Sequence, residues 1–371
     1  MVAITPWAHS IHYMYDAFLL VSFGGPEHPD EVMPFLENVT RGRGVPPERL
    51  AEVAQHYQRF GGVSPINQHC RELVVAIRAD FAVHGLELPV YWGNRNWRPM
   101  LADTLAQMRD HGIERAVAFV TSAYGSYSSC RQYLEDIAAA REKVGPGAPE
   151  VDKLRHFYDH PGFVEPFADA TKTAFKQLDK SARATTRLVF TAHSIPVSMA
   201  RTAGGTAGPA GLRDGGTAGG MSNGGLYERQ LRDTARLVAE RSLPDVGWDL
   251  VWQSRSGPPS VPWLEPDVNE HLRLVAKDGV TQVVVVPIGF VSDHLEVIWD
   301  LDEEAAATAR QLGLGFARAH TPGTDARFVT MVRDLVVERM RPSSGGTRRA
   351  LGRLDHWDVC AAHCCPAPVR R

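Results

Sequence analysis

Short apolar runs alternate along this chain with longer amphipathic segments. The runs that predict strands lie at residues 17–23, 116–121, 188–192, 248–253 and 282–288. Helical periodicity follows each of them, for example over residues 30–37, 100–110, 131–142, 227–240, 296–311 and 326–340. Alternating strands and helices are typical of βαβ units, and an uninterrupted apolar run such as 283–286 suits a parallel strand buried on both faces. The pattern predicts an α/β fold with mainly parallel sheets.

The chain of 371 residues is long enough for two domains of about 150 residues with additional segments. We predict an N-terminal extension over 1–15, with Met14 as an alternative start, a first α/β domain over 16–185 and a second over 186–324. The helix at 325–340 is expected to join the first domain. The glycine-rich stretch 201–225 has almost no large apolar residue, which predicts a flexible insertion. Residues 341–371 form a cysteine-containing tail, and both ends are expected to lie outside the core.

Composition excludes several classes of protein. Hydrophobic residues make up 44% and charged residues 22%, and the net charge is -3, which is typical of a soluble globular protein and not of a basic nucleic-acid binder. We find no apolar run of the roughly 18 residues that a membrane span needs, and no secretory signal pattern. We therefore expect a cytoplasmic protein, and a monomer. In a reducing compartment, the clustered cysteines among the five indicate metal binding or redox chemistry.

Two segments that follow predicted strands can carry chemistry, and in open α/β sheets ligands bind beyond the carboxyl ends of the strands. His193 directly follows one strand, where an imidazole can accept a proton or bind a metal, or simply cap the strand end. Glu296, Asp300 and Glu304 recur at four-residue spacing after another strand. This spacing puts three carboxylates on one helical face, either as a path for cations or protons or as a solvated acidic surface.

These segments resemble the ferrochelatase family, and within it the actinobacterial enzymes that act on coproporphyrin III. The matching stretches include LLVSFGGPEHPDEVMPFLENVTRGRGVP, QRFGGVSPINQ, TAHSIP, WQSRSGPPSVPWLEPDV and PIGFVSDHLEVIWDLD, and the resemblance covers residues 16–340 apart from the insertion. It implies two Rossmann-like, chelatase-type domains, each a parallel β-sheet flanked by helices, with a cleft between them.

The resemblance also implies roles for individual residues. His193 is expected to contact the metal and accept pyrrole protons, Glu296 to act as its partner across the macrocycle, and Asp300 and Glu304 to continue as an acidic relay. Ser64 and Tyr133 match porphyrin-contacting positions. Arg41 lies where a cation can meet a propionate, although a solvent-facing arginine is an equal interpretation. Phe23 replaces a tyrosine that ligates iron in some relatives, so that axial contact is lost. Further candidates for clamp walls, each alternatively plain core, are Trp97, Tyr124, Tyr127, Trp252 and Trp263.

The expected activity is insertion of ferrous iron, as substrate, into coproporphyrin III to form Fe-coproporphyrin III in haem biosynthesis, which makes the protein a lyase. Removing two pyrrole protons while the ring is bent requires a base and a tight apolar clamp. Two alternatives stay open. The first is a protoporphyrin IX ferrochelatase, and the second is a non-catalytic tetrapyrrole or metal carrier on the same scaffold.

Three cysteines, Cys360, Cys364 and Cys365, lie close together near the end of the chain. Soft ligands at this spacing suit an iron–sulfur cluster or zinc, and Cys130, which follows a strand, is the natural fourth ligand. The resemblance implies a 2Fe-2S cluster held by these four cysteines. Zinc bound by the tail cysteines and His363, or unliganded thiols, are the alternatives.

Overall fold

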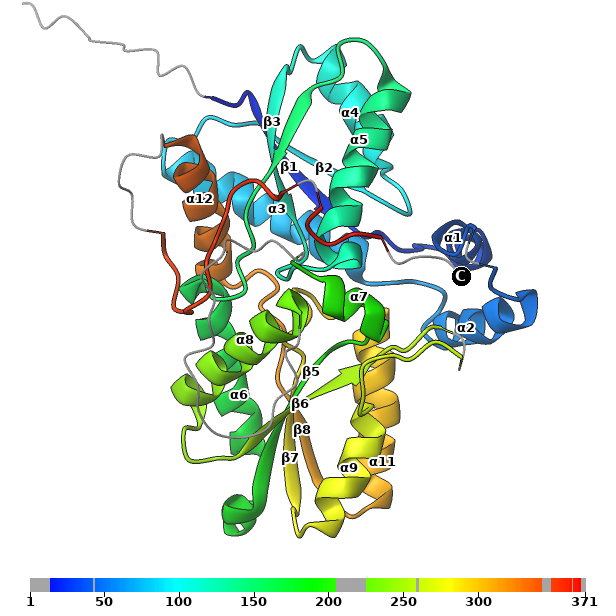
Figure 1. Ribbon diagram of the computed structural model, residues 1–371, viewed down its shortest axis with the longest axis vertical. Helices are drawn as coiled ribbons and strands as arrows, with labels where there is room; N and C mark the ends of the chain where they lie inside the picture. Colours follow the sequence, from blue (N-terminus) through cyan, green and yellow to red (C-terminus); the bar gives the residue numbers. More distant parts are fainter. Residues whose placement is uncertain are drawn as a thin grey trace, which may run out of the picture.

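Two four-stranded parallel sheets form the framework of the protein (Figure 1). The computed structural model describes residues 14–42, 44–204, 225–257, 260–341, 348–361 and 363–367. The first sheet has the order β2-β1-β3-β4, with β1 Ala17–Ser22, β2 Val90–Asn94, β3 Arg115–Val120 and β4 Glu150–Lys153. The second has the order β6-β5-β7-β8, with β5 Thr186–His193, β6 Trp248–Gln253, β7 Gln282–Val286 and β8 Gly315–Arg318. The predicted pair of parallel α/β sheets is confirmed.

The apolar pattern of the sequence predicted the central strands but missed three of the four edge strands. β1 and β7 are buried at every position, so they read as the continuous apolar runs that predicted them. The prediction missed β2, β4 and β8, which are four or five residues long and lie at sheet edges. Their partial exposure admits polar residues, as in EVDK of β4, and this weakens the apolar signal.

Helices cover both faces of each sheet, and they are best followed in chain order. Those connected with the first sheet are α1 Val32–Val39, α2 Pro47–Arg59, α3 Ile66–Val83, α4 Leu101–Asp110 and α5 Gln132–Val144. Those that follow are α6 Pro161–Gln177, α7 Val197–Thr202, α8 Leu226–Ser242, α9 Val268–Lys277, α10 Leu295–Val297, α11 Ala306–Gln311 and α12 Ala326–Met340. Short helical segments complete the set, namely η1 Pro29–Glu31, η2 Tyr127–Arg131, η3 Lys180–Thr185 and η4 Ile298–Ala305.

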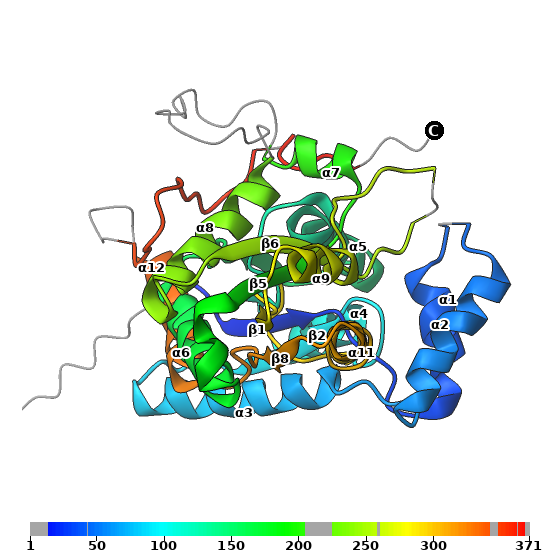
Figure 2. The same ribbon diagram turned by 90° about the horizontal axis from the view of Figure 1, so that it is seen from below.

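Alternate residues of the central strands enter different cores. Leu19 of β1 packs with α4 and α5, whereas Phe18 and Leu20 enter a core shared with the second sheet. Likewise Val189 of β5 packs with α9 and α11, whereas Phe190 enters the shared core. Because successive strand residues point to opposite faces, each sheet contributes one face to a private core and one to the common core. Figure 2 shows α6 and α8 on one side of the second sheet and α9 and α11 on the other.

The helix α6 lies on the far side of the domain boundary expected from the sequence. It precedes residue 185, yet it contacts β7, β8 and α8 of the second sheet, and α12 packs against both α6 and α3. The reason is that Phe163 and Phe167 of α6 enter the shared core with α12 and Phe190. The apolar face of a helix decides which sheet it covers, and sequence position alone does not show this.

The expectation that both chain ends lie outside the core is wrong for the described parts. Tyr15 is 1% exposed and its hydroxyl donates to Asp152 Oδ2 at 2.7 Å. Cys364 and Cys365 of the tail are buried in the shared core. The basic composition of the tail concealed these few apolar contacts. Of the predicted insertion 201–225, residues 205–224 lie outside the described residues. Among the helices that are described, none has the length and apolar character to cross a membrane.

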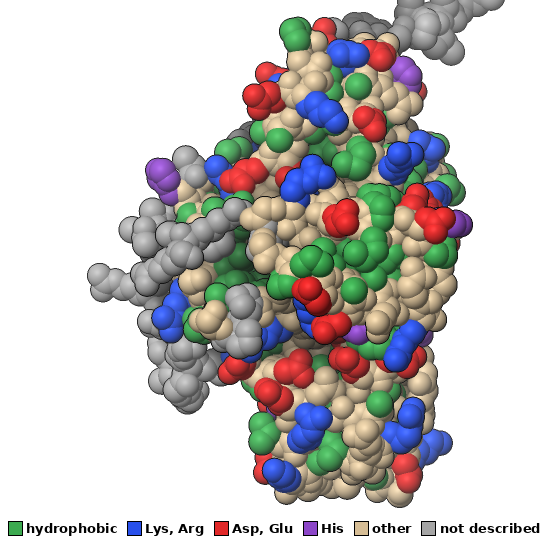
Figure 3. All heavy atoms as spheres, turned by 90° about the vertical axis from the view of Figure 1, so that its right-hand side faces the viewer, with side chains coloured by type: hydrophobic (Ala, Val, Ile, Leu, Met, Phe, Trp, Pro, Cys, Tyr) green, Lys and Arg blue, Asp and Glu red, His purple; other side chains and the backbone are tan. Residues whose placement is uncertain are grey.

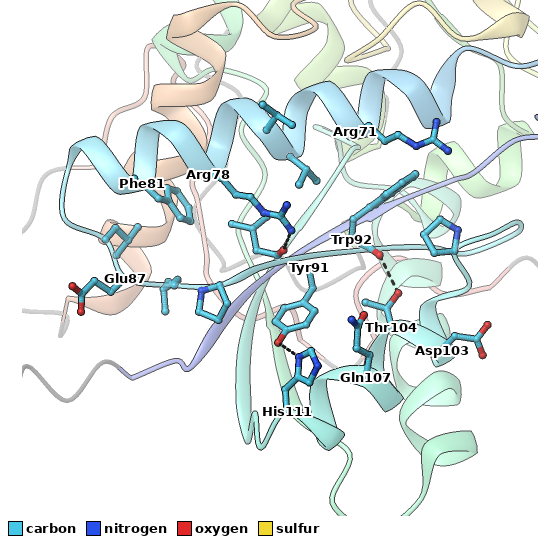
Figure 4. A pocket seen from close by; sticks show the side chains of 18 of the residues that line it. Arg71, Arg78, Phe81, Glu87, Tyr91, Trp92, Asp103, Thr104, Gln107 and His111 are labelled. Atoms are coloured by element: carbon cyan, nitrogen blue, oxygen red, sulfur yellow. Dashed lines mark hydrogen bonds between the residues drawn. The ribbon is translucent and has the colours of Figure 1, made fainter.

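A groove of about 1160 Å³ runs along the outer edge of β2, between α3 and α4 (Figure 4). Arg78 donates to the Val90 carbonyl at 2.7 Å, and the Thr104 hydroxyl donates to the Trp92 carbonyl at 2.9 Å. These bonds occupy carbonyls on the free edge of the sheet, which otherwise invites strand pairing between molecules. The groove is therefore lined by a protected sheet edge, and none of the predicted site residues belongs to its walls.

Candidate active site

His193 is the last residue of β5, and its imidazole is held in one tautomer. Its Nδ1 lies in hydrogen-bonding contact with the Ser194 carbonyl oxygen, which can only accept, so Nδ1 carries the hydrogen. The Nε2 lone pair is then free to take a proton or bind a metal. The Tyr227 hydroxyl donates to the His193 carbonyl at 2.9 Å and fixes the backbone at this point. The His193 side chain stays partly exposed, so the ring can be reached from outside the protein.

Glu296 lies opposite His193, on the helical segment that follows β7. Its Oε2 is 3.9 Å from His193 Nε2, and half of its side chain is exposed. Leu295, immediately before it, is buried among residues of α1 and α2, which anchors the start of this segment. The structure therefore brings together the histidine and the carboxylate that the sequence nominated from two separate strand ends.

The two side chains are too close for a porphyrin to lie between them. A flat ring needs about 3.5 Å on each face, so a sandwich would separate the groups by about 7 Å. At 3.9 Å they can address a metal only from the same face of a macrocycle. The expectation that Glu296 acts across the macrocycle from His193 does not fit this geometry.

Asp300 continues the acidic row, in a π-helical segment and not in the regular α-helix that the spacing predicted. Gln253 Nε2 donates to its Oδ2 at 3.1 Å, and the Ser254 hydroxyl donates to the same oxygen. Burial, reinforced by the charges of Glu296 and Glu304, raises the pKa of Asp300 to about 7 despite these two hydrogen bonds. Asp300 can therefore change protonation state near neutral pH.

Glu304 is exposed one turn further along, at the end of the row. A π-helical stretch inside an α-helix is rare and frequently occurs at functional sites. Figure 3 views the side of the molecule that carries α2 and α11, where Asp and Glu side chains gather. The row thus extends from a partly exposed pair of groups, past the partly buried carboxyl of Asp300, to the exposed carboxylate of Glu304.

The helical pair α1–α2 packs on this segment through contacts that sequence reasoning missed. His56 stacks on Trp299 with ring centroids 4.0 Å apart, and the Arg59 guanidinium lies 5.1 Å from the Trp299 ring centre. Tyr57 is buried, which raises the pKa of its hydroxyl, and the Glu296 charge adds to this effect. These residues are far apart in the chain, and nothing in their spacing indicated the contact.

The candidate porphyrin contacts are distributed around the first sheet. Ser64 is buried against Gly25 in the loop after β1, where a β-carbon on Gly25 would lie 2.7 Å from Ser64 Cβ. Tyr133 is 4% exposed, and the Arg95 guanidinium covers its ring at 4.3 Å. Arg41 is exposed in the turn after α1. The described contacts do not join these three residues to one another.

Two of the aromatic clamp candidates belong to the core. Tyr124 is 2% exposed and donates its hydroxyl to the Ile288 carbonyl at 2.8 Å. Trp252 is 3% exposed and stacks on Tyr227. The Tyr124 bond joins the segment after β3 to the segment after β7, so it connects the carboxyl ends of the two sheets. For these two residues the alternative interpretation as core is the one that fits.

The four cysteines of the predicted cluster are neighbours. The thiols of Cys130 and Cys364 hydrogen-bond to Cys360, which holds the pKa of Cys360 below its usual value and raises those of its two partners. Cys365 Sγ lies 3.7 Å from Cys364 Sγ and accepts the Gly204 backbone N–H at 3.3 Å. Four soft donors with a backbone donor beside them fit the ligand set of an iron–sulfur cluster. Within the described residues, no three His, Cys, Asp or Glu side chains converge on a position for a single metal ion.

Cys70, the fifth cysteine, lies in α3 and is buried, and burial raises the pKa of its thiol to about 11. A thiol with this pKa stays protonated at neutral pH, as expected for a structural residue.

Comparisons with known proteins agree with this architecture. A solved structure of SirB from Bacillus subtilis with Fe3+ superposes with a TM-score of 0.52 at 11% identity, covering 88% of this chain and 97% of that one, which supports the fold alone. The coproporphyrin III ferrochelatase of Nocardia farcinica is 54% identical over 96% of this chain and 97% of its own, and that of Streptomyces coelicolor is 52% identical over 96% and 95%. The ferrochelatase family profile matches residues 15–340. This chain belongs to the ferrochelatase family.

Proposed function

We propose that this chain inserts ferrous iron into coproporphyrin III, forming Fe-coproporphyrin III in haem biosynthesis. The names of relatives that match it over nearly their whole length support the choice of porphyrin. The observation that carries the chemistry is the approach of His193 Nε2 to Glu296 Oε2, at 3.9 Å, beyond the carboxyl ends of the neighbouring strands β5 and β7. Imidazole nitrogen and carboxylate oxygen are both suitable ligands for ferrous iron.

His193 is the proposed base of the reaction. The contact of its Nδ1 with the Ser194 carbonyl leaves Nε2 as the acceptor, so the imidazole can take a pyrrole proton without changing tautomer first. Glu296, on the same face of the porphyrin, balances the positive charge that His193 acquires and can hold the incoming iron. Both groups therefore work from one side of the ring.

Asp300 and Glu304 are the proposed route by which protons leave. Asp300 accepts protons at pH values above about 7, the pKa that burial gives it. Glu304 is exposed and can release them to water. In this proposal Ser64 and Tyr133 contact the porphyrin, and Arg41 binds a propionate. Arg41 is exposed in the turn after α1, so its guanidinium is free to meet a carboxylate of the substrate.

The activity is tested by porphyrin fluorescence under anaerobic conditions with ferrous iron. We expect consumption of coproporphyrin III that is faster than consumption of protoporphyrin IX under identical conditions. The variant His193→Ala should lose insertion while retaining the far-UV circular dichroism of the wild type. Unchanged coproporphyrin fluorescence with wild-type protein would indicate a carrier and refute the proposal. Faster turnover of protoporphyrin IX would refute the substrate assignment.

We further propose that Cys130, Cys360, Cys364 and Cys365 hold a 2Fe-2S cluster. The mutual contacts of the four thiols and the Gly204 N–H beside Cys365 support this assignment. The purified wild type should show a visible absorption spectrum of a cluster that Cys360→Ser abolishes. Colourless wild-type protein that contains zinc would contradict the assignment.

A further inference from the structure

His156 lies beside the cysteine site, and the proposed iron insertion gives it no task. It belongs to the loop after β4, and 8% of it is exposed. Its ring and the Cys360 thiol influence each other electrostatically, which places the two side chains close together.

Gln230 shows which nitrogen of the His156 ring carries a hydrogen. Gln230 Oε1 accepts the Gly125 backbone N–H at 2.7 Å, which fixes the orientation of the amide. Its Nε2 then faces His156 Nδ1, at 3.4 Å. Because an amide nitrogen can only donate, His156 Nδ1 is the acceptor and the ring hydrogen is on Nε2.

The resulting Nε2–H is a buried donor with no hydrogen-bond partner among the described residues. Buried polar groups in proteins nearly always have a partner, and where the polypeptide supplies none, a water molecule or a bound group can do so. A cluster held by the four cysteines would supply sulfur acceptors in the neighbourhood of this donor, because His156 and Cys360 lie close together.

We propose that His156 donates its Nε2–H to a sulfur atom of the iron–sulfur cluster and is a positioning residue of that centre. This inference rests on the cluster proposed above. Hydrogen bonds to cluster sulfurs are among the factors that set reduction potential, since they stabilise the more negative, reduced state. Such outer partners also orient the ligands themselves. His156 therefore makes the cluster easier to reduce and slows its loss.

The test is a spectroelectrochemical titration of the cluster in the purified full-length protein. His156→Leu removes the donor, whereas His156→Gln retains an N–H at a similar reach. His160→Gln is the matched control. His160 is also buried and its Nε2 also lacks a hydrogen-bond partner among the described residues, but it lies at the N-terminus of α6 and faces Asp334, at 3.9 Å, away from the cysteines. We expect a more negative reduction potential in His156→Leu, and potentials close to wild type in the other two variants.

A second measurement separates a hydrogen bond from direct ligation. Pulsed electron paramagnetic resonance of the reduced, 15N-histidine-labelled protein should show a weak nitrogen coupling that His156→Gln and His156→Leu abolish. An unchanged potential in His156→Leu overturns the role of His156, as does a coupling as strong as that of an iron-bound nitrogen. Wild-type protein that lacks cluster absorption overturns the cluster proposal, and the inference with it, so the two failures are distinguishable.

Discussion

Replacing Asp300 by asparagine is expected to make the protein more stable and less active at once. Asparagine has nearly the same shape, and its side-chain oxygen can accept the hydrogen bonds that Gln253 and Ser254 give to Asp300. It lacks the charge that burial disfavours. The substitution therefore removes an electrostatic cost and a proton acceptor with little change in packing.

The cost follows from the pKa of Asp300, raised from 3.8 to about 7. At about 1.36 kcal/mol per pKa unit, the charged form destabilises the folded state by about 4 kcal/mol. Because the pKa of Asp300 is higher in the folded state than in the unfolded state, only the ionised carboxylate destabilises the fold. Below pH 3.8 Asp300 is protonated in both states and there is no cost. The cost grows as the pH rises from 3.8 to 7 and is complete above pH 7. The cost is about 1.7 kcal/mol at pH 5. The stability advantage of Asp300→Asn should thus grow by about 2 to 3 kcal/mol between pH 5 and pH 8.

Urea unfolding at the two pH values measures this difference, with Glu303→Gln as the control. Glu303 is an exposed carboxylate on the same helical segment, so its substitution should change stability little and equally at both pH values. A pH-independent effect of Asp300→Asn would refute the reasoning, because packing changes do not titrate. Insertion by Asp300→Asn should fall roughly 10²-fold, the lower end for loss of a proton-transfer group. Wild-type rates in this variant would remove Asp300 from the proton route.

Three further substitutions test contacts that position the site. His356→Phe keeps an aromatic ring stacked on Tyr158 but loses the 2.9 Å hydrogen bond to Asp159, so limited proteolysis should cleave residues 348–361 faster than in the wild type. An unchanged cleavage rate would show that this hydrogen bond does not hold the tail. Tyr124→Phe removes the hydrogen bond from the Tyr124 hydroxyl to the Ile288 carbonyl and should lower the free energy of unfolding in urea by about 1 kcal/mol. An unchanged free energy of unfolding would mean that water replaces the hydroxyl at this carbonyl. Trp299→Ala should speed amide exchange in α2 but not in α9, and equal effects on both would indicate global destabilisation instead.

The parts of the fold that the sequence predicted are those in which local pattern and burial coincide. Strands β1 and β7 are buried throughout, so their residues had to be apolar in succession. The position of α6 could not be predicted, because its amphipathic pattern shows that one face is buried but not against which sheet. The same limit applies to the stack of His56 on Trp299, which depends on how α2 and the segment after β7 meet in space.

For the candidate site, the sequence supplied the residue types, and the structure supplied their relations. His193 and Glu296 were nominated because both follow strands. Their 3.9 Å separation, which excludes a ring between them, depends on β5 and β7 being neighbours in one sheet, an order that the sequence does not show. Asp300 was nominated by its spacing, but its raised pKa comes from burial beside Gln253 and Ser254, at the end of a different strand. Neither property is encoded in a motif.

The cysteine site and the candidate active site share a segment of chain, and this gives the burial of the tail a structural reason. His193 ends β5, and α7 begins four residues later and leads to Gly204, whose N–H is bonded to Cys365 Sγ. The Ser128 hydroxyl, in the π-helical turn that also carries Cys130, contacts Met199 of α7 at 3.6 Å. The first sheet's π-helical turn and the tail therefore both hold the helix that continues from His193. A tail outside the core could not make this contact, so the burial of Cys365 is part of the support of the site.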